Sequence, residues 1–152
     1  MKALSSVVLL TGLMISGFAQ ASQLPDEALN TFQLLRSYTR GYDLTAGKAA
    51  NGHPCSLKFD YTVINGKGSV YVSLTAGDTE AFKEVAIYSS AISKLESVTA
   101  TEIKMGDWGW DGEETNFVLS RTEAALSVKA EYTYSEDYGN GTTSDTCTFA
   151  KK

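Results

Sequence analysis

Residues 55–74 read CSLKFDYTVINGKGSVYVSL, and this stretch predicts a β-hairpin. In 55–63 every second side chain is apolar and the side chains between them are polar. A period of two is typical of an antiparallel strand that buries one face. The dipeptide Asn65-Gly66 is a strong signal for a tight turn, and the alternation resumes in 70–74. The hairpin is therefore the starting point for predicting the rest of the fold.

Further strands are predicted beyond the hairpin. Residues 126–134 alternate as cleanly as the first strand, and shorter strand-like runs occupy 98–105, 116–120 and 146–150. Turn residues separate these runs, including a glycine-rich turn expected over 135–144. The runs recur about every ten residues, which favours an antiparallel β-sandwich or a small closed barrel of about six to eight strands. The predicted fold class is mainly β with helical additions (α+β).

Residues 24–42 predict a helix ahead of the β region. Leu29, Phe32 and Leu35 recur at helical spacing, and acidic residues near the start suit the positive end of a helix dipole. Residues 44–54 are rich in glycine, alanine and asparagine, so we expect a loop there.

Residues 80–97 are ambiguous. Phe82, Val85 and Ile92 follow a helical spacing, and several alanines favour helix. The run 85–88 is in contrast compatible with a strand. We favour a second helix near 80–97, with a strand as the alternative.

Cys55 and Cys147 are the only cysteines of the chain. Two cysteines in an exported protein predict one disulfide. The bond would close a loop of 92 positions (147 minus 55). In the chain-entropy model a loop this long stabilises the fold by about 4–5 kcal/mol. The two Cα atoms must lie within about 7 Å, so the first and last strands of the β region, 55–150, are expected to lie close together, which points to a closed or nearly closed sheet.

Residues 1–21 have the layout of a bacterial secretory signal peptide. Lys2 precedes an uncharged, mostly apolar run, and Ala19-Gln20-Ala21 offers small residues at the cleavage positions. The expected mature chain, residues 22–152, folds as a single domain that is periplasmic or secreted.

The expected mature chain is acidic. It keeps 12 of the 13 basic residues, because Lys2 is removed, against 18 acidic residues, which gives a net charge of −6 (12 minus 18). This balance argues against nucleic acid or an anionic membrane as the partner. If the partner is a protein, the balance favours a basic protein.

Motifs for catalysis are scarce. His53 is the only histidine, so a two-histidine metal site cannot be built and a Ser-His-Asp triad has little support. The sequence carries neither a P-loop nor a dinucleotide-binding fingerprint, and no metal or cofactor is expected. Carboxylates are numerous, which leaves open a small hydrolase that uses two of them.

Residues 106–114 read GDWGWDGEE and hold both tryptophans together with four carboxylates. Exposed indoles stack on sugar rings or anchor protein interfaces, while acids accept hydrogen bonds. The predicted ligand-binding residues are Asp107, Trp108, Trp110 and Asp111. A structural turn with its indoles folded over the sheet and a calcium site both remain alternatives.

Together these features predict an exported, non-enzymatic binding protein for a protein or glycan partner, with an inhibitor of a basic enzyme as one version. The chain is similar to small periplasmic lysozyme inhibitors only in being an acidic, disulfide-closed β protein of comparable size, so no residue role is carried over. The alternatives are a carboxylate-dependent hydrolase of cell-wall or extracellular polymer and a structural component of an envelope assembly.

Overall fold

The computed structural model describes residues 27–78, 83–108, 113–136 and 139–152. Within these ranges the chain forms one helix and nine strands. Their bounds are α1 (Glu27–Tyr38), β1 (Gly47–Ala49), β2 (Pro54–Ile64), β3 (Lys67–Asp78), β4 (Lys83–Ala91), β5 (Lys94–Val98), β6 (Glu102–Trp108), β7 (Glu114–Arg121), β8 (Ala125–Glu136) and β9 (Gly139–Ala150). The predicted signal peptide lies outside the described residues. In the part of the chain that is described, no helix has the length and apolar character needed to cross a membrane.

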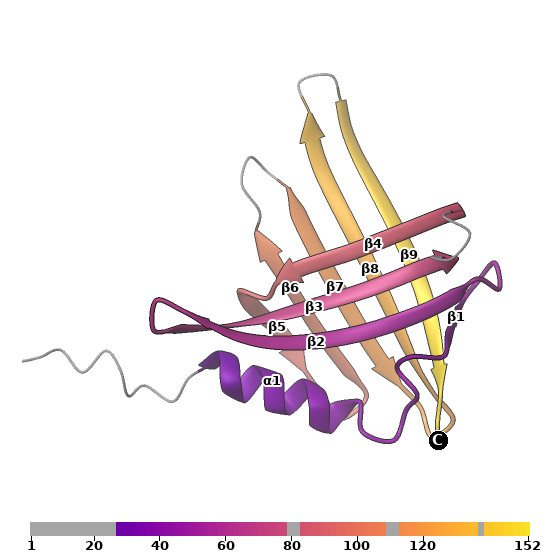
Figure 1. The fold of residues 1–152 in the computed structure, drawn as a ribbon, viewed down its shortest axis with the longest axis horizontal. Helices are drawn as coiled ribbons and strands as arrows, with labels where there is room; N and C mark the ends of the chain where they lie inside the picture. The colour runs from indigo at the N-terminus through magenta and orange to yellow at the C-terminus, as the bar shows by residue number, and fades with distance from the viewer. Residues whose placement is uncertain (1–26, 79–82, 109–112, 137–138) are drawn as a thin grey trace, which may run out of the picture.

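All nine strands belong to one antiparallel sheet, in the order β4-β3-β2-β1-β9-β8-β7-β6-β5. The sheet curls, so that β2, β3 and β4 lie across β5 to β9 in a half-barrel, and α1 packs beside β2 and β3 (Figure 1). The predicted mainly antiparallel β architecture is confirmed. The predicted strand number was too low, and the sheet is an open curl instead of a closed barrel.

The core fills the space between the two layers of the curl. Leu57, Val72 and Val128 are buried, as the alternation predicts. The largest fully buried side chains come from α1 and five strands: Leu35, Leu74, Ile103, Met105, Phe117, Leu119, Leu126 and Phe149. Val63 has the same phase as Leu57 but is 59 % exposed, because the tip of the β2–β3 hairpin extends past the opposite layer (Figure 1).

The segment between β4 and β5 is a corner at which the chain passes from one layer to the other. The Ile92 N–H donates to the Val70 carbonyl at 2.7 Å, which continues the β3–β4 ladder. The Ser93 N–H donates to the Gly106 carbonyl at 3.3 Å, which begins the pairing of β5 with β6. At this corner, backbone hydrogen bonds therefore connect consecutive residues to both layers of the curled sheet.

The second helix predicted near 80–97 is wrong, because 83–91 and 94–98 form β4 and β5. The alanines favour helix by less than about 1 kcal/mol per residue. Against this preference, β4 completes a hydrogen-bonded ladder with β3, and β5 completes one with β6. Long-range pairing therefore decides the conformation of this segment.

The predicted disulfide between Cys55 and Cys147 is present, with its Cα atoms 6.1 Å apart. It joins β2 to β9 across β1, whose three residues pair with both strands. The loop predicted over 44–54 is therefore wrong at 47–49. A side chain at Gly47 would overlap the buried ring of Phe149, which explains the glycine at this position.

The C-terminal end of the predicted helix is also wrong. α1 ends at Tyr38 and not at residue 42. Tyr42 instead forms an isolated β-bridge with Lys151, and its hydroxyl donates to the Thr122 carbonyl at 2.7 Å. These contacts draw the chain after α1 towards the ends of β7 and β9.

The turn predicted over 135–144 is too long. β8 continues to Glu136 and β9 begins at Gly139, so most of this segment is paired strand. Gly141, one of the glycines that indicated a turn, has a packing role instead, because a side chain there would overlap the ring of Tyr134 on the neighbouring strand.

Candidate ligand-binding cleft

A cleft of about 360 Å³ lies where β4 crosses the opposite layer. On this side of the molecule, away from α1, β8 and β9 extend beyond β4 (Figure 1). The residues that line the cleft are Ala86, Ile87, Tyr88 and Ser89 from β4, with Thr115, Tyr132 and Thr143 from β7, β8 and β9.

Two larger hollows lie next to α1. One of about 530 Å³ borders Glu27, where the described chain begins, and one of about 580 Å³ lies over Leu29, Arg36 and Arg40 on the helix surface. We regard the cleft at β4 as the candidate site, because its lining combines aromatic and hydroxyl side chains from four strands.

The floor of the cleft is one cross-strand row. Thr115 pairs with Tyr132, which pairs in turn with Thr143. Two positions deeper on β7 and β8 come Phe117 and Ala130, which are fully buried. The row therefore belongs to the inward face of the sheet and marks the level at which the apolar core gives way to hydroxyl groups.

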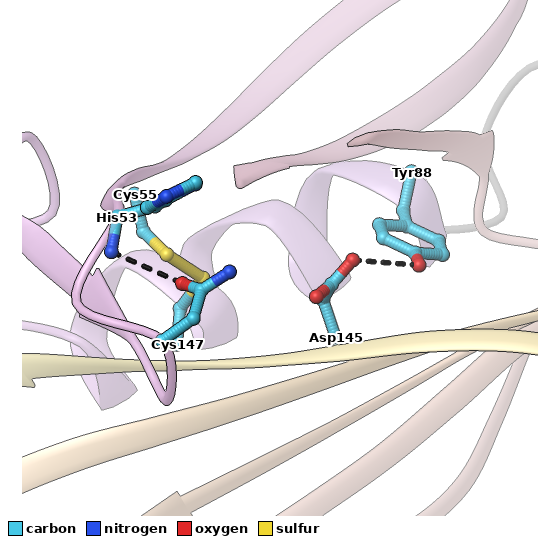
Figure 2. Close-up of a disulfide and its surroundings, with 6 residues drawn as sticks. His53, Cys55, Tyr88, Asp145 and Cys147 are labelled. Carbon is cyan, nitrogen blue, oxygen red and sulfur yellow. Dashed lines mark hydrogen bonds between the residues drawn. A yellow bond between two sulfur atoms is a disulfide. The ribbon is translucent and has the colours of Figure 1, made fainter. Parts of the chain in front are cut away.

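Tyr88 crosses the cleft from β4. Its side chain is 5 % exposed, and its hydroxyl donates to Asp145 Oδ2 on β9 at 2.9 Å. Figure 2 shows this contact on the same strand as Cys147, which carries the disulfide to Cys55. Burial raises the pKa of Tyr88 above its ordinary value of 10.0, and the hydrogen bond to Asp145 raises the pKa further. Tyr88 is therefore a neutral hydrogen-bond donor near neutral pH.

Asp107 on β6 also accepts a hydrogen bond from β4, as Asp145 on β9 does. The Ser90 hydroxyl on β4 donates to Asp107 Oδ2 on β6 at 2.9 Å. Ser90 and Tyr88 are two residues apart, so they share the inward face of β4. Two carboxylates on two different strands thus hold β4 against the opposite layer.

Aromatic surface continues from the floor towards the open end. The rings of Tyr132 and Tyr134 are stacked, with centroids 5.9 Å apart and planes 25° apart. Tyr134 lies over Gly141, where no side chain separates the ring from the strand. Both tyrosines are half-buried, so part of each ring remains accessible.

Only part of the predicted site can be located. Asp107 lies at the interface between the layers, beside the cleft. The Trp108 backbone pairs with Glu114 at the end of β6, and its side chain is outside the described structure. Trp110 and Asp111 lie entirely outside the described residues. The prediction for these three side chains therefore remains a prediction.

Sequence reasoning missed the floor of the cleft, since it treated the tyrosines as ordinary strand residues. A usable signal was present in β9. Counting back by twos from Cys147 gives Asp145 and Thr143, which are polar residues at inward positions. On β8 the same phase passes from Ala130 to Tyr132. A change from apolar to polar along one face indicates the end of the core.

The disulfide lies apart from the cleft, at the junction of β1, β2 and β9. Near it the His53 N–H donates to Asn51 Oδ1 at 3.0 Å, within the turn before β2 (Figure 2). Among the described residues, no three histidine, cysteine or acidic side chains are grouped in a way that could hold a metal ion.

Comparison with known proteins gives no match: no family model, no curated protein and no solved structure resembles the chain.

Proposed function

We propose that this chain is an exported, non-enzymatic binding protein whose ligand occupies the cleft between β4 and the β7–β9 layer. The observation that carries the proposal is the cleft itself, a hollow of about 360 Å³ with tyrosine and threonine side chains on its floor. Concave sites with an aromatic surface and a few convergent polar groups are typical of ligand binding.

The floor suits a ligand that combines an apolar face with hydrogen-bonding groups. The Tyr132 ring offers a flat apolar surface, and Thr115 and Thr143 on either side offer hydroxyl groups that donate and accept. A sugar ring and an extended peptide both have this character. The predicted binding residues Trp108 and Trp110 follow Asp107 closely in the sequence, and their part in the site stays a prediction.

The carboxylates near the cleft support binding over hydrolysis. Asp145 already accepts a hydrogen bond from Tyr88, and Asp107 accepts one from Ser90. Each acid is thus engaged in holding β4, whereas a catalytic pair must face its substrate across the cleft.

The test is a titration of the purified, isotope-labelled protein, followed by amide chemical shifts. The probes are chitotetraose as a glycan and lysozyme as a basic protein. We expect at least one probe to shift amides of β4 and of the floor row. Unchanged amides in all four strands with both probes would contradict the proposal.

A matched pair of variants on β9 assigns the binding to the cleft. Thr143 lines the cleft, whereas Ser144 points to the outer face, and both are exposed. Thr143→Arg should weaken binding by at least about tenfold, or 1.4 kcal/mol, because the long side chain fills the cleft. Ser144→Arg adds the same charge and should leave the affinity unchanged. Cleavage of a polymer that Asp145→Asn abolishes would favour the hydrolase instead.

A further inference from the structure

The cleft runs along the backbone edge of a strand. β4 is the terminal strand of the sheet, with β3 as its single neighbour in the strand order. Four consecutive residues, Ala86 to Ser89, line the cleft. Successive side chains of a strand point to opposite faces, so four in a row can border one hollow only if the hollow lies against the strand's edge.

The direction of the backbone groups of β4 follows from one hydrogen bond. The Ile92 N–H donates to the Val70 carbonyl, and in an antiparallel ladder the hydrogen-bonded pairs recur at every second residue. Ser90, Tyr88 and Ala86 therefore direct their N–H and C=O groups to β3. Ile87 and Ser89 direct theirs to the open edge, along the cleft.

The central part of this edge carries no charge, although β4 begins with Lys83 and Glu84. Residues 85–91 contain neither a charged residue nor a proline, and Ile87 is 66 % exposed. Soluble proteins usually guard such edges with lysine, proline or a covering segment, because an unpaired edge is a template for another strand. Seven residues extend over about 23 Å, enough for an added strand of similar length.

The surroundings indicate the charge of the added strand. None of the described residues lining the cleft is lysine or arginine, and Asp107 and Asp145 lie beside it. The whole chain has a net charge of −5. A basic segment therefore gains electrostatic attraction on approach, whereas an acidic one is repelled.

From the edge, the cleft and the charge we infer that β4 binds an extended segment of a basic protein, which pairs with it antiparallel or parallel as a tenth strand. This inference rests on the proposed binding function of the cleft and names its ligand class. The added strand hydrogen-bonds with Ile87 and Ser89 through its backbone. Its alternate side chains face the Tyr132 row, and the remaining side chains lie beside Ile87 on the outer face.

The experiment uses a displayed library of random nine-residue peptides, selected on the purified protein. Enriched peptides are synthesised, and their affinities are measured on the wild type and on two variants of one position. Ile87→Pro removes an edge-facing N–H without removing a bond to β3, and proline is tolerated on an edge strand in this orientation. Ile87→Thr keeps the N–H and the β preference but shortens the apolar side chain.

We expect enriched peptides to be rich in lysine and arginine, to lose at least about tenfold in affinity on Ile87→Pro, and to retain affinity within about threefold on Ile87→Thr. A second arm does not depend on the folding of a variant. Two versions of each peptide are made, one with N-methyl groups on its odd-numbered residues and one with them on its even-numbered residues. One of the two versions should lose its binding to the wild type.

Other results overturn the inference in distinguishable ways. Peptides that bind wild type and Ile87→Pro equally, yet are lost on Thr143→Arg, leave the cleft as a binding site but exclude strand addition. Enrichment of acidic peptides, or of no peptide, excludes a basic strand as the ligand. A wild-type dimer that Ile87→Pro converts to monomer would make a second copy of this chain the occupant of the edge.

Discussion

The hydroxyl of Tyr88 links the chemistry of one residue to the stability of the fold. Because burial and Asp145 favour the neutral phenol, the pKa of Tyr88 in the folded protein lies above its value in the unfolded chain. The stabilisation from this difference is complete below the unfolded pKa, near 10.0. It is lost as the pH rises through the folded pKa, because the unfolded chain releases its proton first.

We predict that the free energy of unfolding falls as the pH rises above 10.0, and that it falls less steeply in Tyr88→Phe. Burial also raises the pKa of Tyr38, so part of the alkaline loss should remain in the variant. At neutral pH the variant should be less stable by about 1.5 kcal/mol, because Asp145 loses its charged hydrogen bond. Urea unfolding at several pH values measures both effects.

Tyr71→Phe on β3 is the matched control, since it removes a phenol hydroxyl from the outer face of the sheet. An alkaline slope in Tyr88→Phe as steep as that of the wild type would exclude Tyr88 as its source.

Among the elements, β2 and β4 differ in how far their sequences determine them. In β2 the period of two, the Asn65-Gly66 turn and the following strand all indicate the same structure, and the hairpin forms as predicted. In β4 the alanines and the spacing of Phe82, Val85 and Ile92 indicate helix. The strand forms there because β3 supplies a pairing partner, which local pattern does not reveal.

The candidate site was only partly accessible to prediction, for a similar reason. Asp107 was singled out through its neighbours in the sequence, and it lies beside the cleft. Tyr132 and Thr143 are cross-strand partners on β8 and β9, and Tyr88 on β4 reaches them only because the sheet curls. Their proximity depends on strand order, which the spacing of strands along the chain does not determine.

The disulfide yields a prediction at the scale of elements. It holds β2 and β9 together where β1 contributes only two residue pairs to each neighbour. Replacing both Cys55 and Cys147 with alanine should lower the free energy of unfolding by about 4–5 kcal/mol. The cause is chiefly the greater conformational freedom of the unfolded chain, because residues 55 and 147, which are 92 positions apart, are no longer cross-linked.

Urea unfolding of this double variant measures the loss, with Ser56→Ala on the exposed face of β2 as the control. Reduced wild type should unfold at the same urea concentration as the variant. A loss below about 1 kcal/mol would mean that the unfolded chain is already compact across this span.

For the whole molecule, the unprotected edge of β4 should govern self-association. We predict that Ile87→Lys lowers the rate of aggregation of the protein at high concentration while the midpoint of thermal unfolding changes little. Ile87 is 66 % exposed, so its replacement removes little buried area, and an edge lysine opposes strand-to-strand pairing. Light scattering during incubation near neutral pH measures the effect.

The control places the same charge elsewhere. Val98 on β5 is 47 % exposed and lies on the strand at the other end of the sheet order. If Val98→Lys suppresses aggregation as strongly as Ile87→Lys, net charge alone is responsible and the β4 edge has no special part.

The position of β9 has a consequence for the order in which the molecule can assemble. β9 is the last strand in the chain, yet it is the middle strand of the sheet. A growing chain that stops before Gly139 can form two separate meanders, β1 to β4 and β5 to β8, with no strand to join them. It also lacks Cys147, so Cys55 cannot yet form its disulfide. The strand at the centre of the sheet is therefore the last to be synthesised, and the two meanders can join into one sheet only after it is present.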